Sequence, residues 1–369
     1  LTCAFLRALI VRAARSGTCN KLLAAITTSG TCNSLSIDTH KFSVIELAGF
    51  VDLTPWHRFG FAAANSAVLE AVEGFPVVHI VDLGMTHCMQ IPTLLDAIAT
   101  RFESPPLIRI TVARNPEGVP PMINLSYEEL GSKLVNFARS RNLMVEFRAV
   151  PSSYTDGFSS LIDQLRVQQQ QHLVYGEGAN QTGEALVINC QMSLHYIPDE
   201  TVATVDSNPS SNSLSSFRSM FLKSVRSLDP TVVVLVDEDA DLTSNNLVCR
   251  LRSAFNYLWI PYDTVDTFLP KGSKQRDWYE AEVCWKIENV IAHEGLQRVE
   301  RLEPKSRWVQ RMRAAGFRGS PFSDDAVSEV KNMLDEHAAG WGLKKEEDEH
   351  LVLTWKGHNV VFATAWVPA

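Results

Sequence analysis

The chain has 369 residues, of which 45% are hydrophobic and 21% charged, so it is long enough for one large domain or two ordinary ones. Acidic residues outnumber basic ones by 42 to 34, and the formal net charge of -8 argues against a surface coated for polyanions. The seven cysteines include no C-x-x-C pair, which indicates neither a disulfide framework nor a zinc site and favours a reducing compartment. No apolar run is long enough to span a membrane.

Residues 1–70 show helical periodicity. Apolar residues recur at helical spacing in the first 13 residues, and a second helix is expected over 53–72. That helix begins with Thr54-Pro55, a capping residue followed by a first-turn proline. We expect 1–70 to form a helical cap and 71–369 an α/β core. Because Leu1 is not a start methionine, the chain is interpreted as an excised domain.

From Phe75 the pattern changes to strands that alternate with helices. Short runs rich in β-branched residues predict strands at 77–83, 107–113, 143–150, 184–192 and 231–239. Strands that alternate with helices predict a parallel sheet covered on both faces. The end of the chain differs, because the strand-like runs 351–356 and 360–367 flank a short turn at Gly357 and predict an antiparallel hairpin.

Two polar segments interrupt this series and are expected to be solvated loops. The first runs from Gln168, through four glutamines, to Gly183, and the second from Thr201 to Ser216.

Acidic residues follow the fifth predicted strand. They are Asp237, Glu238, Asp239 and Asp241. Such a carboxylate group suits a divalent cation. It equally suits the first turn of the next helix, where acids complement the helix dipole, and we favour that interpretation.

Five alternating strands and a terminal hairpin resemble the Rossmann-like methyltransferase fold. A nucleotide in such a sheet lies where the first strand enters its helix, because glycines there let backbone N–H groups approach the ligand. In this turn only Gly84, two residues after Asp82, fits that pattern. Thr86 and Cys88 occupy positions where further glycines are expected, and their side chains obstruct close approach.

The second strand also lacks a cofactor signal, because it ends on Ala113-Arg114 and not on an acid for ribose hydroxyls. We therefore expect no cofactor, no metal and a vestigial ligand pocket at Asp82, Gly84 and His87. The sequence contains no G-x-S-x-G, H-E-x-x-H or Walker A pattern. The chain is thus not expected to be an enzyme.

Several motifs follow one another along the chain. Residues 54–71 precede a short strand made of Val78, His79, Ile80, Val81 and Asp82, and the segments 107–111, 125–150 and 287–323 follow it. Near the end lie Trp341, Gly342, Trp355 and Trp366. In this order, these segments resemble the first leucine-rich region, the VHIID motif, the LRIT strand, the second leucine-rich region, the closing pattern and the SAW region of the GRAS family of plant transcriptional regulators, nearest to its scarecrow-like members.

Two departures from the family pattern occur. The PFYRE-like region can be traced through Pro230 and Phe255, but Trp285-Lys286 stands where an Arg-Glu pair is expected, and Thr364 replaces the serine of SAW. The resemblance implies a nuclear transcription regulator that works as a homodimer or heterodimer with other GRAS proteins and through DNA-binding transcription factors. The alternative is an S-adenosylmethionine-dependent methyltransferase, or a small-ligand receptor, built on the same fold.

Any direct contact with promoter DNA needs a local basic patch. Residues 298–318 carry seven basic against two acidic residues, a local excess of +5 in an acidic chain. The candidate DNA-binding residues are Arg298, Arg301, Lys305, Arg307, Arg311, Arg313 and Arg318. Arg307 and Arg311 are one helical turn apart and are expected to share a face. The alternative is a solvated helix face with Glu–Arg pairs.

Overall fold

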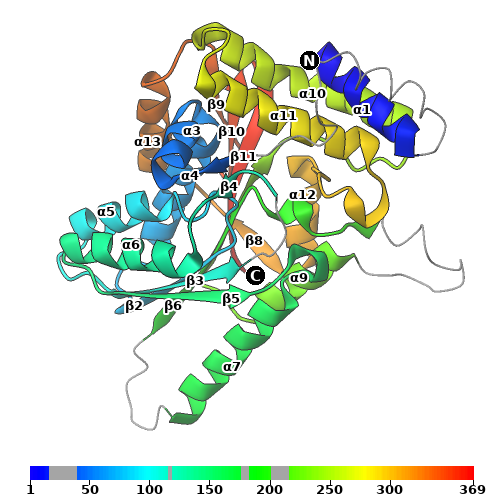
Figure 1. Ribbon diagram of the computed structural model, residues 1–369. Coiled ribbons are helices and arrows are strands. Elements are labelled where there is room, and N and C mark those ends of the chain that lie inside the picture. Colours follow the sequence, from blue (N-terminus) through cyan, green and yellow to red (C-terminus); the bar gives the residue numbers. More distant parts are fainter. Residues whose placement is uncertain (16–39, 115–118, 176–182, 201–215) are drawn as a thin grey trace, which may run out of the picture.

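The computed structural model describes residues 1–15, 40–114, 119–175, 183–200 and 216–369. Its centre is a nine-stranded sheet in the order β5-β3-β2-β6-β7-β11-β10-β9, with β8 paired to β11. The helices lie on both sides of this sheet (Figure 1). The sheet strands are β2 (Val77–Asp82), β3 (Leu107–Arg114), β5 (Val145–Pro151), β6 (Glu184–Gln191), β7 (Val232–Glu238), β8 (Phe317–Ser320), β9 (Trp341–Glu346), β10 (His350–Trp355) and β11 (His358–Pro368).

The five predicted strands of the core pair in parallel, and the predicted C-terminal hairpin is β10 and β11. Lys356 and Gly357 both have positive φ, 47° and 85°, as a tight two-residue hairpin turn requires. β11 lies between β7 and β10 and is antiparallel to both. The strand β9, which the sequence did not predict, extends the sheet beyond β10.

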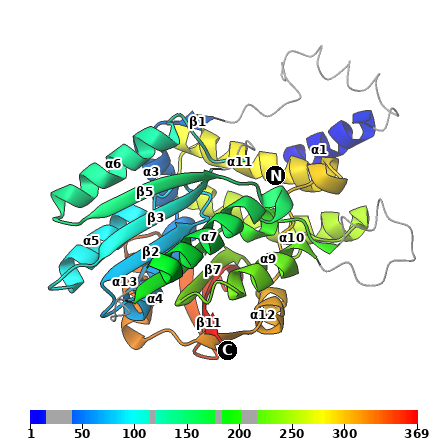
Figure 2. The ribbon, with the colours of Figure 1, turned by 90° about the horizontal axis from the view of Figure 1, so that it is seen from below.

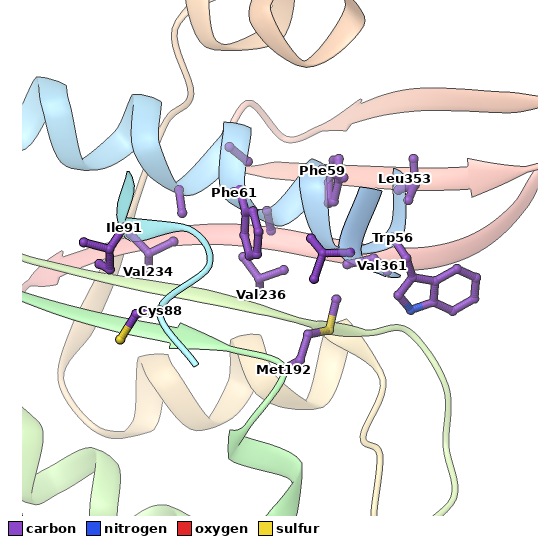
Figure 3. Packing of buried hydrophobic residues seen from close by; sticks show 14 of the residues in the cluster. Trp56, Phe59, Phe61, Cys88, Ile91, Met192, Val234, Val236, Leu353 and Val361 are labelled. Carbon is purple, nitrogen blue, oxygen red and sulfur yellow. The ribbon is translucent and has the colours of Figure 1, made fainter. Parts of the chain in front are cut away.

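Four helices in the described part of the chain cover one face of the sheet. They are α4 (Pro55–Ala71), α5 (Ile91–Arg101), α6 (Tyr127–Ser140) and α13 (Asp324–Asp335). Thr54 caps α4 as predicted, because its side chain accepts a hydrogen bond from the Trp56 N–H. Phe59 and Phe61 of α4 lie in the apolar layer between that helix and β7, β10 and β11 (Figure 3). At Gly60 the helix approaches so closely that a Cβ would lie 2.7 Å from the Val236 side chain.

The opposite face is covered by α7 (Ser159–Tyr175), α9 (Phe217–Arg226) and α12 (Lys305–Ala314), and Figure 2 shows α7 and α9 across it. The prediction of a loop from Gln168 is wrong in its first part, because all four glutamines belong to α7. Residues 176–182 and 201–215 of the two predicted loops lie outside the described residues, and Ser216 precedes α9 as its N-cap.

The remaining helices lie beyond the carboxyl ends of the parallel strands. They are α1 (Thr2–Arg15), α3 (Val44–Asp52), α10 (Leu247–Phe268) and α11 (Lys274–Ala292). α1 packs on α11, and α10 packs on α11 as well (Figure 1). A short parallel pair, β1 (Lys41–Phe42) and β4 (Met122–Ile123), lies outside the main sheet. α1, α3 and α10 thus pack with α11, whereas α4, which we expected in the helical cap, packs on the sheet itself.

Candidate functional site

The VHIID-like strand is β2, at the centre of the parallel sheet between β3 and β6. Val78 and Ile80 are fully buried under α4 and α5, while Val81 faces the other apolar layer. The His79 Nε2 atom lies 2.8 Å from the Thr111 hydroxyl on the neighbouring strand. Alternation along a strand buried on both faces explains why this motif is nearly all apolar.

The turn after β2 is closed by its own side chains. The Asp82 carboxylate accepts hydrogen bonds of 3.0 Å from the Gly84 N–H and from the Asn189 side-chain amide. Burial raises the pKa of Asp82 above its ordinary value. His87 does not join them, because its Nε2 donates to the Pro121 carbonyl over 2.9 Å. The structure thus brings Asp82 and Gly84 together and turns His87 away.

A chain of amide side chains fills the space beside this turn. Asn189 donates to Gln90 over 2.8 Å, and Gln90 donates to Asn65 of α4 over 3.0 Å. Gln191 reaches both Asn189 and the Gly60 carbonyl. The backbone N–H groups of residues 83–85, which would meet a phosphate in a nucleotide-binding protein, donate here to Asn189, Asp82 and Gln191.

A cavity lies next to this region, between the ends of β2, β6 and β7 and the helices α10 and α11. Trp56 and Met192, both labelled in Figure 3, contribute to its wall. The space open to water-sized molecules is about 50 Å³. That volume accommodates a few waters or one small chemical group.

Charged residues from three elements meet at this cavity. The Lys286 ammonium lies 2.7 Å from the Glu238 carboxylate and 3.9 Å from that of Glu300. Glu238 also accepts a hydrogen bond of 3.0 Å from the Trp56 indole N–H. Although burial acts against the charge, Glu238 and Glu300 raise the pKa of Lys286. Lys286, which departs from the family pattern, is therefore the cation that neutralises the end of β7.

Two other groups on the wall have shifted pKa values. Burial raises the pKa of Glu282 to about 7, with Glu238 and Glu300 adding to the rise and Lys286 opposing it. Burial lowers the pKa of His57 to about 4, so this imidazole is neutral at pH 7.

The acidic residues at the end of β7 and just after it bind neighbouring elements, and they do not lie in the first turn of the next helix. Asp237 lies 2.7 Å from His195 Nδ1, and Asp239 accepts a hydrogen bond from the Lys305 N–H. The next helix begins at Leu247 and is capped by Asn246, with no acidic residue in its first turn. The interpretation as helix-turn residues is therefore wrong. The described residues also contain no group of three side chains suited to a metal ion.

Two of the seven candidate DNA-binding residues are interior. Arg298 and Arg301 are 1% and 2% exposed. The Arg298 guanidinium donates to the carbonyls of Leu242, Thr243 and Ser244, and burial lowers its pKa to about 9. Arg301 forms an ion pair of 3.2 Å with Asp199. The prediction that Arg298 and Arg301 bind DNA phosphates is therefore wrong, because their guanidinium N–H groups are bound to carbonyl and carboxylate oxygens inside the fold.

Arg311 and Lys305 are also committed to partners. Arg311 is held at 2.7 Å by the buried Glu303, whose carboxylate binds Arg218 at 3.0 Å as well. Lys305 pairs with Glu346. Arg307 shares the Arg311 face as predicted, because it lies 3.7 Å from the same Glu303.

Three of the candidate residues keep substantial exposure. Arg307 and Arg313 are 37% and 56% exposed, and Arg318 is exposed on β8. Arg307 contacts Asp241 at 3.2 Å, and Arg313 lies 3.7 Å from Glu349. The accessible basic surface is therefore smaller than the sequence suggested.

Comparisons with known proteins identify the family of this chain. The model of the GRAS domain family matches residues 1–367. The chain belongs to the GRAS family of plant transcription regulators.

Relatives of this GRAS chain include the Arabidopsis thaliana "Scarecrow-like protein 32", 58% identical over 371 residues that span 100% of this chain and 84% of that protein. "Scarecrow-like transcription factor PAT1" from the same plant is 30% identical, over 85% of this chain and 59% of its own length. The crystal structure of SCL7 from Oryza sativa superposes with a TM-score of 0.68 at 25% identity, covering 87% of this chain and 82% of that one. The α/β fold with a mostly parallel sheet is thus shared with a GRAS structure.

The SAW-like residues of this GRAS chain build the antiparallel edge of the sheet. Trp341 of β9 packs on the fully buried Trp355 of β10 at 4.8 Å between ring centroids. A Cβ at Gly342 would lie 2.9 Å from the Thr354 hydroxyl. Trp366 donates to the hydroxyl of Thr364, the residue that replaces the serine of SAW, over 2.9 Å.

The sequence missed the residues that line the cavity. His57, His195 and Glu282 lie in three different helices or turns, and no spacing links them along the chain. The one available signal was Lys286, noted as a departure from the family pattern. Its ion-pair partner, Glu238, cannot be identified from the sequence, because the two residues meet only where α11 covers the end of β7.

Proposed function

We propose that this GRAS protein is a nuclear transcription regulator that works without catalysis, as a homodimer or heterodimer and through DNA-binding transcription factors. The observation that carries this proposal is the filled turn after β2, where the amides of Gln90, Asn189 and Gln191 lie beside Asp82. The names of relatives, including "Scarecrow-like transcription factor PAT1", agree with such a role. Within the described helices, none is long and apolar enough to cross a membrane.

The sheet supports a distant relation to Rossmann-like methyltransferases. Its five parallel strands are followed by an antiparallel strand, β11, inserted next to the fifth. That arrangement favours the alternative of an S-adenosylmethionine-dependent enzyme or small-ligand receptor. The closed turn at Asp82 and Gly84 weighs against a nucleotide-type cofactor.

A dimer is supported by apolar residues on the cap. Leu6 of α1 is 58% exposed, and Val248 and Phe255 of α10 are 65% and 38% exposed. Phe5 and Phe255 stack at 3.9 Å and hold the two helices together. Neighbouring exposed apolar side chains favour a protein interface.

Promoter contact, where it is direct, is proposed for Arg307, Arg313 and Arg318. They are the exposed remainder of the basic segment, and their guanidinium groups suit phosphate. The acidic neighbours Asp241 and Glu349 weaken this surface. We therefore expect modest, salt-sensitive affinity, with protein partners supplying much of the selectivity.

A tethering experiment tests the proposed function. The chain, fused to a heterologous DNA-binding domain in plant protoplasts, is expected to change transcription of a reporter, and the unfused chain serves as control. A calorimetric titration with S-adenosylmethionine is expected to show no binding. Micromolar binding that is lost in Gly84→Val, together with an unchanged reporter, would favour the methyltransferase instead.

A further inference from the structure

The cavity beside β7 has a surplus of negative charge. The carboxylates of Glu238 and Glu300 are both within 4 Å of the Lys286 ammonium. Glu282, one turn before Lys286 on α11, also lines the cavity. Within the described parts of the chain, its carboxylate has no hydrogen bond or ion pair. Glu238 and Glu300 therefore take up the Lys286 ammonium, and among the described residues Glu282 has no counter-charge within 4 Å.

Aromatic rings form much of the cavity wall. Trp56 and Tyr257 have ring centroids 6.3 Å apart, and Phe50 and Tyr279 have centroids 5.8 Å apart. The faces of such rings are negative, so a cation among them is stabilised electrostatically. The wall is thus suited to a group that is both positively charged and partly apolar.

Two imidazole nitrogens on the same wall lack a hydrogen bond. The Nδ1 atom of His57 and the Nε2 atom of His195 are inaccessible to solvent and have no hydrogen-bond partner among the described residues. The His195 side chain is 2% exposed, and its Nε2 lies 3.5 Å from Glu300, outside hydrogen-bonding geometry. Both atoms are closed to solvent, so they add polar character to the wall without contacting a molecule in the free space.

We propose that this cavity binds an aliphatic ammonium group, with the carboxylate of Glu282 as its counter-charge and the surrounding rings as its walls. The free space suits a short aliphatic chain ending in an ammonium and is too small for a nucleotide. The arrangement does not suit a metal ion, since the described residues hold no group of three metal-binding side chains. The inference does not depend on the proposed regulatory function.

The test uses the full chain and n-propylammonium as the probe, followed by calorimetry and saturation-transfer NMR. The neutral alcohol n-propanol, which has the same number of heavy atoms, is the control ligand. We expect the ammonium to bind and the alcohol not to. Equal binding of both compounds, or the absence of ammonium binding at millimolar concentration, would overturn the proposal.

Variants of α11 assign the binding to Glu282. Glu282→Gln is expected to weaken ammonium binding at least about tenfold, whereas Glu282→Asp retains the charge and loses less. Asp277→Asn removes the same charge from an exposed position of α11 and should leave binding unchanged. Thermal melts verify that each variant folds. Unchanged affinity in a folded Glu282→Gln variant contradicts the assignment.

Two sources share this ligand chemistry, a free small amine and a lysine side chain of a protein partner. Nα-acetyl-lysine methylamide distinguishes them, because its ammonium is attached to a peptide backbone. Binding comparable to that of n-propylammonium indicates that a lysine side chain can enter the cavity. Binding of n-propylammonium alone indicates a free amine.

Discussion

Two groups of buried charged residues in this molecule differ in whether every charge has a partner of opposite charge or a hydrogen-bonding group. Around α12, Glu303 lies between Arg218 and Arg311, and Arg298 is surrounded by backbone carbonyls. At the cavity, Lys286 is shared by carboxylates while Glu282 has no partner among the described residues. Charges that are fully paired hold elements together, whereas a charge without a partner destabilises the fold until a ligand supplies one.

The difference follows from where each segment lies. Residues 298–304 pass through the interior beside the loop at 242–245, where carbonyls point inward and arginine donors satisfy them. The α11 helix instead lies over strand ends, where a cavity of about 50 Å³ remains. The number of charged residues along the chain does not distinguish a segment whose charges are paired from one that leaves a charge unpaired.

Removing the central acid of the paired group should have the largest effect. Glu303→Gln leaves Arg218 and Arg311 buried without a full counter-charge, so we expect a loss of about 3–5 kcal/mol in the free energy of unfolding. Urea denaturation measures it, with the exposed Glu347→Gln as control. A loss below about 1 kcal/mol would mean that the pairing contributes little.

Removing the unpaired acid should have the opposite sign. The pKa of Glu282 is raised from 4.5 to about 7 in the folded chain, so the unfolded chain releases this proton first and stability falls as the pH rises from 4.5 to about 7. Glu282→Gln should therefore stabilise the chain by up to about 3 kcal/mol at pH 8, with little difference below pH 4.5. Thermal melts across this pH range measure the difference. A difference that does not vary with pH contradicts the raised pKa.

Reversing charges on the exposed surface should alter stability least. In Arg313→Glu with Arg318→Glu, we expect a change within about 0.5 kcal/mol, because both side chains are largely solvated. The DNA affinity should fall and its salt dependence should flatten, as measured by gel retardation. The double variant Lys133→Glu with Lys331→Glu, at exposed positions of α6 and α13, is the matched control. Equal retardation by both variants would remove this surface from the DNA proposal.

The sequence predicted regular elements better than it predicted the site. The β-branched run at Val232–Glu238 and the Thr54-Pro55 helix start depend on neighbours in the chain, so both were predicted correctly. The exposure of Arg298 depends on the loop at 242–245, more than 50 residues away, and was predicted incorrectly. The glutamines of α7 resembled a loop by composition, although glutamine is an adequate helix former.

The position of β11 has a consequence for synthesis of the chain. Residues 358–368 supply the partner of β7 on one side and of β10 on the other. Until these residues leave the ribosome, β7 has an open edge and the apolar side chains of α4 that face Val361 lack their cover. Between the synthesis of β7 and that of β11 the nascent chain therefore presents an unpaired strand edge, and we expect it to depend on chaperones during that interval.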